Sequence, residues 1–172
     1  MNIRLAGTCD DSIVDGHGIR YTIFVQGCPH HCDGCHNPQT HDFFGGYIDT
    51  TEHLIDEILE NPLLDGVTFS GGEPFCQANE LFYLGSAIKS IKPQLDIITY
   101  SGFTFEHLFK NANQYNGYLN LLKISDMLVD GKFEKDKQSY DLVFRGSSNQ
   151  RFIDCKKSIK YKKAIEFKTV YA

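Results

Sequence analysis

The sequence has no tryptophan, only five prolines among its 172 residues, and no long apolar run. No apolar segment approaches the roughly 20 residues that a membrane-spanning helix requires. The beginning of the chain also lacks the apolar stretch of a secretory signal, since Asp10, Asp11 and Asp15 lie where that stretch would be. We therefore expect a cytoplasmic protein that does not enter a membrane.

Positive charge is also scarce. The 17 Lys and Arg residues against 22 Asp and Glu residues leave a net charge of −5, whereas a general nucleic-acid binder would carry a basic domain. The charge is uneven, because residues 151–172 hold seven Lys or Arg residues and only two acidic ones. This basic tail, about residues 154–172, is expected either to be solvated and less ordered or to dock to an acidic partner.

Internal repeats, low-complexity segments and Pro- or Gly-rich linkers are absent, so a single domain is expected over residues 1–172. Hydrophobic residues make up 41% of the chain, which is enough apolar material for a core and argues against disorder. Short apolar runs typical of strands alternate with helical patterns, and this alternation predicts βαβ units with a parallel sheet.

The expected strands cover residues 20–25, 67–70, 96–100 and 127–130, with a possible fifth strand at 142–145. The helices are recognised by their start and stop signals. One follows the capping pair Asp49 and Glu52, a second has an apolar stripe from Leu81 to Ile91 and stops at Pro93, and a third lies near 105–112.

Polar or Gly-rich segments follow each expected strand. They are residues 27–37, 71–74, 101–102, 131–132 and 146–150. Because the carboxyl ends of parallel strands share one face of a sheet or barrel, these segments are expected to converge on one site.

Three of the six cysteines form a C-x3-C-x2-C pattern within the first of these segments: Cys28, Cys32 and Cys35. Thiolates this close repel one another unless a cation holds them, so the spacing indicates a metal. A structural zinc needs four ligands, and a histidine of the same loop would have to complete the set. The candidates are His30, His31 and His36.

A cubane iron–sulfur cluster is the other possibility, and it normally has four cysteine ligands. Either a remote cysteine supplies the fourth ligand, or one iron stays open and can bind a substrate or cofactor. The remote cysteines are Cys9, Cys76 and Cys155, which otherwise have no assigned role beyond that of small buried hydrophobes.

The cysteine pattern followed by Gly71-Gly72-Glu73-Pro74 resembles the radical S-adenosylmethionine superfamily. The segment from Val14 to Arg20 resembles the corresponding part of glycyl-radical activating enzymes, although His17 stands where those enzymes usually have proline. Residues 129–133 and 145–150 resemble segments of the activators of anaerobic ribonucleoside-triphosphate reductase. Together the matching segments span about residues 9–153.

The resemblance implies a [4Fe-4S] cluster on Cys28, Cys32 and Cys35, with one open iron that binds S-adenosylmethionine. One electron, from a donor such as a flavodoxin, would cleave a C–S bond and leave a 5′-deoxyadenosyl radical. That radical would install a glycyl radical on a partner protein, the anaerobic ribonucleoside-triphosphate reductase. No nucleic acid or membrane partner is implied.

The resemblance also implies a set of residues that bind S-adenosylmethionine. Gly71 and Gly72 would let the backbone approach the methionyl group, and Glu73 would accept a hydrogen bond from its ammonium. The Gly34-Cys35-His36 segment would lie against the adenine. Ser101 and Asp130, at the ends of two strands, would bind the methionyl or ribose groups.

The fold implied is an α/β partial, open barrel of about five to six (β/α) units, because a full eight-unit barrel typically needs about 250 residues. Its open side would admit a loop of the partner. Rival hypotheses are an activator of another glycyl-radical enzyme such as pyruvate formate-lyase, and a radical enzyme that makes a deazapurine. A hypothesis from a different class is a zinc-binding interaction module.

Overall fold

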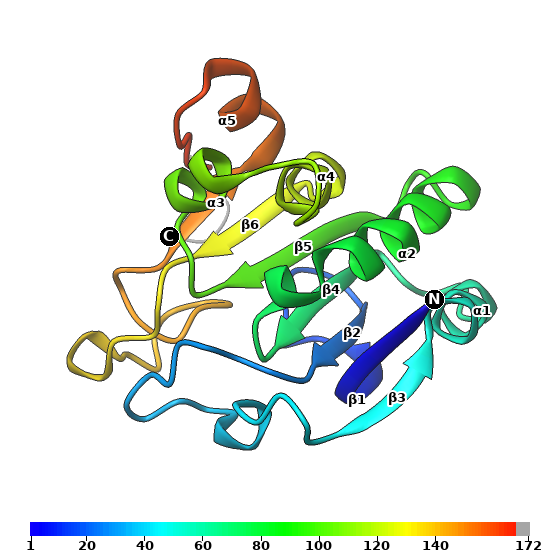
Figure 1. Ribbon diagram of the computed structural model, residues 1–172, viewed down its shortest axis with the longest axis horizontal. Coiled ribbons are helices and arrows are strands. Elements are labelled where there is room, and N and C mark those ends of the chain that lie inside the picture. Colours follow the sequence, from blue (N-terminus) through cyan, green and yellow to red (C-terminus); the bar gives the residue numbers. More distant parts are fainter. Residues whose placement is uncertain (168–172) are drawn as a thin grey trace.

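The computed structural model describes residues 1–167. Within these residues the strands form one seven-stranded sheet in the order β3-β1-β2-β4-β5-β6-β7 (Figure 1). The strands are β1 (Asn2–Ser12), β2 (Arg20–Val25), β3 (Tyr47–Thr50), β4 (Gly66–Gly71), β5 (Asp96–Ser101), β6 (Met127–Asp130) and β7 (Arg151–Asp154).

The centre of the sheet is parallel and its edges are antiparallel. Strands β2, β4, β5 and β6 pair in parallel, whereas β1 pairs antiparallel with β2 and β3, and β7 pairs antiparallel with β6. The expected α/β architecture is confirmed, but a parallel arrangement throughout is wrong at both edges. The parallel run has four strands rather than five to six units, because the short connection from β1 to β2 permits only an antiparallel return.

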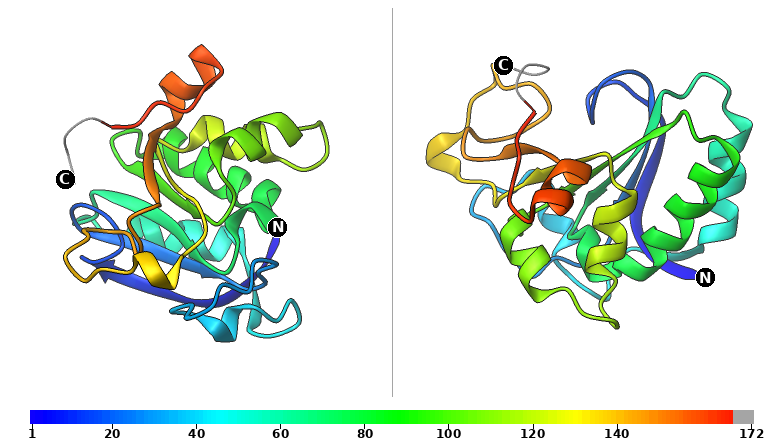
Figure 2. Two further views of the ribbon diagram at one scale, coloured as in Figure 1. Left: turned by 90° about the vertical axis from the view of Figure 1, so that its left-hand side faces the viewer. Right: turned by 90° about the horizontal axis from the view of Figure 1, so that it is seen from above.

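Five α-helices of the described chain cover one face of this sheet (Figures 1 and 2). They are α1 (Thr51–Glu60), α2 (Ala78–Ile91), α3 (Phe105–Asn111), α4 (Tyr118–Ile124) and α5 (Cys155–Tyr161). Their apolar sides, including Leu54, Leu84 and Leu121, pack with alternate strand residues such as Ile23 and Phe69 in the main core. None of the helices within residues 1–167 combines the length and apolar character needed to cross a bilayer.

The N-cap of helix α1 lies one residue after Asp49, which was the expected capping residue. The N-cap is Thr50, whose hydroxyl accepts a hydrogen bond from the His53 N–H, while Asp49 binds the His53 ring. The carboxylate of Glu52 forms an ion pair with the amino terminus, with 2.5 Å between Oε2 and the Met1 nitrogen. Helix α2 agrees with its apolar stripe and ends two residues before Pro93.

The possible strand at 142–145 is wrong, since these residues form a loop in which Phe144 has a φ of 55°. A positive φ in a bulky residue is incompatible with a strand. The last strand is instead β7, and β1, β3, α4 and α5 had no clear sequence signal. Within the basic tail, α5 buries Cys155 and Ser158, so this part is folded, whereas residues 168–172 lie outside the described residues.

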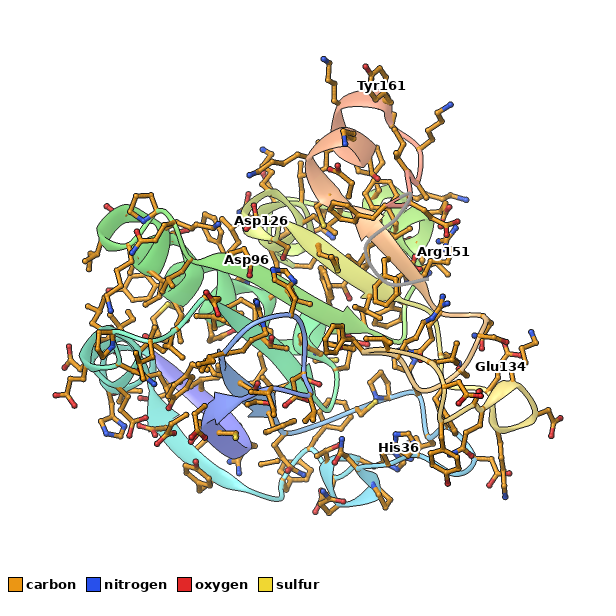
Figure 3. The ribbon with its side chains drawn as sticks, turned by 180° about the vertical axis from the view of Figure 1, so that it is seen from behind. His36, Asp96, Asp126, Glu134, Arg151 and Tyr161 are labelled. Carbon is orange, nitrogen blue, oxygen red and sulfur yellow. The ribbon has the colours of Figure 1, made fainter. Side chains whose placement is uncertain are left out.

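The face of the sheet away from the helices carries different residues because strand side chains alternate. A small apolar cluster of Ile98, Met127, Val129 and Phe152 lies here. Residues 13–19 fold over the same face, where the Thr68 hydroxyl donates to the Asp15 carbonyl at 2.9 Å. Figure 3 views the molecule from this side.

Candidate metal and cofactor site

The segments that follow the central strands meet around one cavity of about 380 Å³. Each expected segment contributes lining residues, among them Cys28, Gly72, Ser101, Gly131 and Gln150. Strands β4, β5 and β6 point toward these loops (Figure 1). The volume falls in the range of about 300–1,000 Å³ that is typical of ligand sites. The loops therefore converge on one site, as the parallel strands predict.

The three thiols of the cysteine loop line this cavity together. Cys28 is buried, and Cys32 and Cys35 are half-buried. The Cys28 N–H donates to the His41 carbonyl at 3.3 Å, and the Asn37 N–H donates to Cys35 Sγ at 3.4 Å. These bonds tie both ends of the loop to the segment that follows it, so the thiols are held on the cavity wall.

Burial raises the pKa of the Cys28 thiol above its usual value, and the Glu73 carboxylate and the two neighbouring thiols raise it further. A hydrogen bond from the His30 backbone acts in the opposite direction. A free thiolate is therefore disfavoured at Cys28, whereas a bound cation would reverse the balance by stabilising the thiolate. These properties suit a metal ligand better than a nucleophile.

The spacing of the thiols bears on which metal they fit. Residues 1–167 contain no group of three or more His, Cys, Asp or Glu side chains placed to hold a single metal ion. A structural zinc requires four ligands that converge on one ion. In a cubane cluster each cysteine binds a different iron, so the ligands stand farther apart. Three thiols on one cavity wall can bind three irons of a cluster, whereas a structural zinc would need a fourth ligand beside them.

Gly72 lines the cavity beside the start of the cysteine loop. Its N–H donates to the Val25 carbonyl at 2.7 Å, and the next N–H, of Glu73, donates to the Gly27 carbonyl at 2.8 Å. A Cβ on Gly72 would lie only 2.4 Å from the Gly27 oxygen. The glycine is therefore required by the close approach of the cysteine loop itself, and not only by the approach of a ligand as expected from sequence.

We expect Gly72→Ala to destabilise the protein by about 1–3 kcal/mol, because the added methyl overpacks against backbone that cannot rotate away. Displacement of Gly27 should also lower the iron content, which chemical analysis can measure beside urea unfolding. Gly7→Ala is the matched control, since a Cβ there meets nothing within 4 Å. A Gly72→Ala protein with wild-type unfolding midpoint and iron content would contradict this account.

Glu73 is fully buried and does not line the cavity. Its Oε1 accepts hydrogen bonds from the Ser101 hydroxyl and the Phe75 N–H, both at 3.0 Å. Its Oε2 accepts from the Gly102 N–H at 2.9 Å and lies 2.7 Å from His30 Nε2. Both oxygens are thus hydrogen-bonded within the protein, and the expected bond from this carboxylate to a ligand ammonium stays a prediction.

Of the other residues expected to bind S-adenosylmethionine, some line the cavity and some do not. Ser101 and His36 line the cavity, and the exposed His36 ring lies 4.9 Å from the Phe133 ring. Gly34 lies outside the lining, where a Cβ would contact Lys135 and Phe133. The pairing of His36 with Phe133 brings two expected segments together, although Phe133 itself had no sequence signal as a site residue.

Asp130 is fully buried and also lies outside the cavity lining. Its Oδ1 accepts from Arg151 Nε at 2.9 Å, and its Oδ2 accepts from the Phe105 N–H at 2.7 Å and from Arg151 Nη2 at 2.5 Å. Arg151 also binds Glu106, and these two carboxylates raise its pKa. Asp130 therefore fixes the start of α3 to β7 through both of its carboxylate oxygens.

The segment 145–150 is a hydrogen-bonded turn on the cavity wall. Gln150 Oε1 accepts from the N–H groups of Gly146 and Ser147, and its Nε2 donates to the Gly131 carbonyl. Arg145 donates to the Gln150 carbonyl at 2.7 Å and lines the cavity. The amide of Gln150 thus joins two of the converging segments, a role that the sequence did not indicate.

Arg20 lies at the start of β2, at the end of the sheet opposite the cysteine loop, and is fully buried. Its Nε donates to the Thr68 hydroxyl at 2.6 Å, and its Nη2 lies 2.6 Å from Asp96 Oδ1. His17 lies on the other oxygen of Asp96, at 2.6 Å. Figure 3 shows Asp96 far from His36, so this network lies away from the cysteine loop, and it stabilises residues 13–19, of which Val14 and Asp15 line the cavity.

The remaining cysteines are spread over the fold. Cys9 is half-buried in β1, and Cys155 is fully buried at the start of α5, where burial raises the pKa of its thiol. Cys76 is exposed, and its thiol pKa is raised to about 12 by desolvation and by the nearby Glu73 and Cys28. None of the three lines the cavity.

Comparisons with known proteins agree with this geometry. A family model described as a 4Fe-4S single cluster domain matches residues 14–153. A protein of Pasteurella multocida (strain Pm70), named anaerobic ribonucleoside-triphosphate reductase-activating protein, is 37% identical over 147 residues, covering 80% of this chain and 89% of that protein. The protein of the same name from Enterobacteria phage T4 is 35% identical over 156 residues, covering 88% of this chain and 92% of that protein.

Among solved structures, the crystal structure of QueE from Escherichia coli is similar with a TM-score of 0.47 and 15% sequence identity. The alignment covers 76% of this chain and 70% of that chain.

Proposed function

Because the chain belongs to the family of anaerobic ribonucleoside-triphosphate reductase-activating proteins, we propose that it installs a glycyl radical on an anaerobic ribonucleoside-triphosphate reductase. The observation that carries this proposal is that all three thiols of the C-x3-C-x2-C loop line a cavity at the carboxyl ends of the parallel strands. In this proposal the whole chain, residues 1–172, is one radical S-adenosylmethionine domain.

Cys28, Cys32 and Cys35 would bind three irons of a [4Fe-4S] cluster and leave the fourth open to the cavity. When bound, the cluster supplies one electron to S-adenosylmethionine, which yields methionine and a 5′-deoxyadenosyl radical. The protein orients the reactants and keeps competing reactions away from the radical. Donors and acceptors on the cavity wall are the groups available for this task.

The methionyl group would lie against the backbone of Gly71 and Gly72 and the hydroxyl of Ser101, which line the cavity. The adenine would lie against the Gly34-Cys35-His36 segment, whose His36 ring already contacts the Phe133 ring with centroids 4.9 Å apart. Glu73 and Asp130, which are buried next to the cavity, would act indirectly by holding the strand ends in place. Their buried bonds support this indirect role.

The open sheet is proposed to be a partial (β/α) barrel whose uncovered side admits a loop of the reductase. Val14, Leu142 and Phe144 line the cavity and supply apolar walls for such a loop. A one-electron donor such as a flavodoxin would reduce the cluster. A cytoplasmic location is proposed because unbridged cysteine thiols persist in reducing compartments.

Metal analysis after anaerobic purification tests the proposal against its rivals. We expect about four irons and four sulfides per chain, and 5′-deoxyadenosine formed from S-adenosylmethionine once a reductant is added. Stoichiometric zinc without iron would favour an interaction module. Iron without 5′-deoxyadenosine would exclude the radical enzyme, and a radical placed on pyruvate formate-lyase but not on the reductase would identify a different partner.

A further inference from the structure

His30 lies between two cysteines of the loop, and it lines the cavity while its ring contacts Glu73. Its Nε2 is 2.7 Å from Glu73 Oε2, and the side chain is only 6% exposed. From the pattern of the loop alone, His30 was one of three candidate zinc ligands. The structure gives its ring a different partner, on the neighbouring strand end.

The histidine ring is packed tightly into this position. It meets the Phe103 ring edge-on, with centroids 4.4 Å apart. A Cβ on Gly102 would lie 2.3 Å from His30 Cδ2, so the backbone after β5 leaves room for the ring and nothing more. One side chain of the cysteine loop is therefore clamped by the ends of both β4 and β5.

The partners of Glu73 within the described chain are two backbone N–H groups, one hydroxyl and this imidazole, with no Lys or Arg among them. A buried carboxylate is costly unless its oxygens are compensated by hydrogen bonds or opposite charge. His30 is the one member of this set that comes from the cysteine loop. Its bond therefore both anchors the loop and compensates the carboxylate.

We propose that His30 is a positioning residue for the iron–sulfur cluster, which holds the cysteine loop on Glu73 and shields the cluster from the charge of that carboxylate. This inference rests on the cluster of the proposed function. Groups just outside the ligands commonly orient them and tune the metal. The reduction potential of an iron–sulfur cluster depends on net charge and hydrogen bonding nearby.

Glu73 lies directly against the cysteine loop, since its backbone N–H donates to the Gly27 carbonyl at 2.8 Å and its Oε2 lies 2.7 Å from His30 Nε2. An added electron makes the cluster more negative, so an uncompensated carboxylate beside the cysteine loop opposes reduction. Loss of the His30 donor should therefore lower the midpoint potential. Loss of the Glu73 charge should raise it.

The test compares substitutions that differ in where they place a donor. His30→Asn puts an amide at the position of Nδ1 and cannot reach Glu73, whereas His30→Gln can place an amide N–H near the position of Nε2. The matched control is His31→Asn, because His31 is the exposed neighbour with a φ of 47°, a conformation that asparagine tolerates. The readouts are iron content and the midpoint potential of the reconstituted cluster without S-adenosylmethionine.

We expect the ratio of reduced to oxidised cluster at a fixed potential to fall about tenfold in His30→Asn, which corresponds to 59 mV for a one-electron couple. His30→Gln and His31→Asn should stay within about twofold of wild type by the same conversion. Glu73→Gln should raise the midpoint potential. If His30→Asn does not fold, the potential of Glu73→Gln tests the inference in its place.

A potential unchanged in His30→Asn, or unchanged in Glu73→Gln, would overturn the inference, as would equal losses in the His30→Asn and His31→Asn variants. These outcomes are separate from failure of the proposed function. If the wild-type protein holds no cluster, the proposed function fails. If it holds a cluster whose midpoint potential is the same in the wild-type, His30→Asn and Glu73→Gln proteins, only the role of His30 fails.

Discussion

The Cys28→Ala variant is expected to lose its cluster and to form no measurable 5′-deoxyadenosine from S-adenosylmethionine and reductant. Cys28 is the most buried of the three cavity thiols, so no water or neighbouring side chain can easily replace it. Changes to groups outside the ligands typically cost about 10–100-fold in metal affinity, so removal of a ligand should cost more than about 100-fold. Iron analysis and chromatography of the products measure both effects.

Cys76→Ala is the control for this variant, because Cys76 is a nearby thiol that is absent from the cavity lining. We expect it to keep wild-type iron content and product formation. If Cys76→Ala lost the cluster while Cys28→Ala kept it, the assignment of the three ligands would be wrong.

Arg20→Met should be the most destabilising single change outside the cysteine site. It removes a fully buried guanidinium that binds Thr68, Asp96 and backbone carbonyls, and it leaves Asp96 with His17 as its remaining ion-pair partner. Breaking a buried ion pair costs about 3–5 kcal/mol, and the lower end applies because Asp96 is 27% exposed. That loss is a large part of the about 5–15 kcal/mol that stabilises a typical domain.

Urea unfolding measures this loss, with Arg4→Met as the control. Arg4 donates to the carbonyls of Phe44 and Gly45 near the surface, so its replacement should cost no more than about 1–1.5 kcal/mol. Equal unfolding midpoints for the two variants would show that the Arg20 network does not hold residues 13–19 in place.

The parallel centre of the fold could be predicted from sequence because its strands are short, apolar and followed by glycine. Strand β2 agrees with the prediction residue for residue, and β6 does so as well. The edges could not be predicted in the same way. Strand β1, between β3 and β2, mixes Gly7 and Asp10 with apolar residues, and an antiparallel strand needs no continuous apolar run.

The candidate site was predictable in its location but not in its internal contacts. Glycine and cysteine at the strand ends indicated where the loops converge. Glu73 and Asp130 were expected to face a ligand, yet both are buried under hydrogen bonds to His30, Ser101 and Arg151. A carboxylate after a strand has the same sequence signal whether or not it also fixes a neighbouring loop, so these contacts of Glu73 and Asp130 could not be predicted from sequence.

The most direct test of the central claim is electron paramagnetic resonance of an anaerobic ribonucleoside-triphosphate reductase incubated with this protein, S-adenosylmethionine and reductant. We expect a glycyl radical on the reductase with the wild-type and Cys76→Ala proteins, and no such radical with Cys28→Ala. A radical of equal intensity with Cys28→Ala, or none with a wild-type protein that holds its full complement of iron, would contradict the central claim.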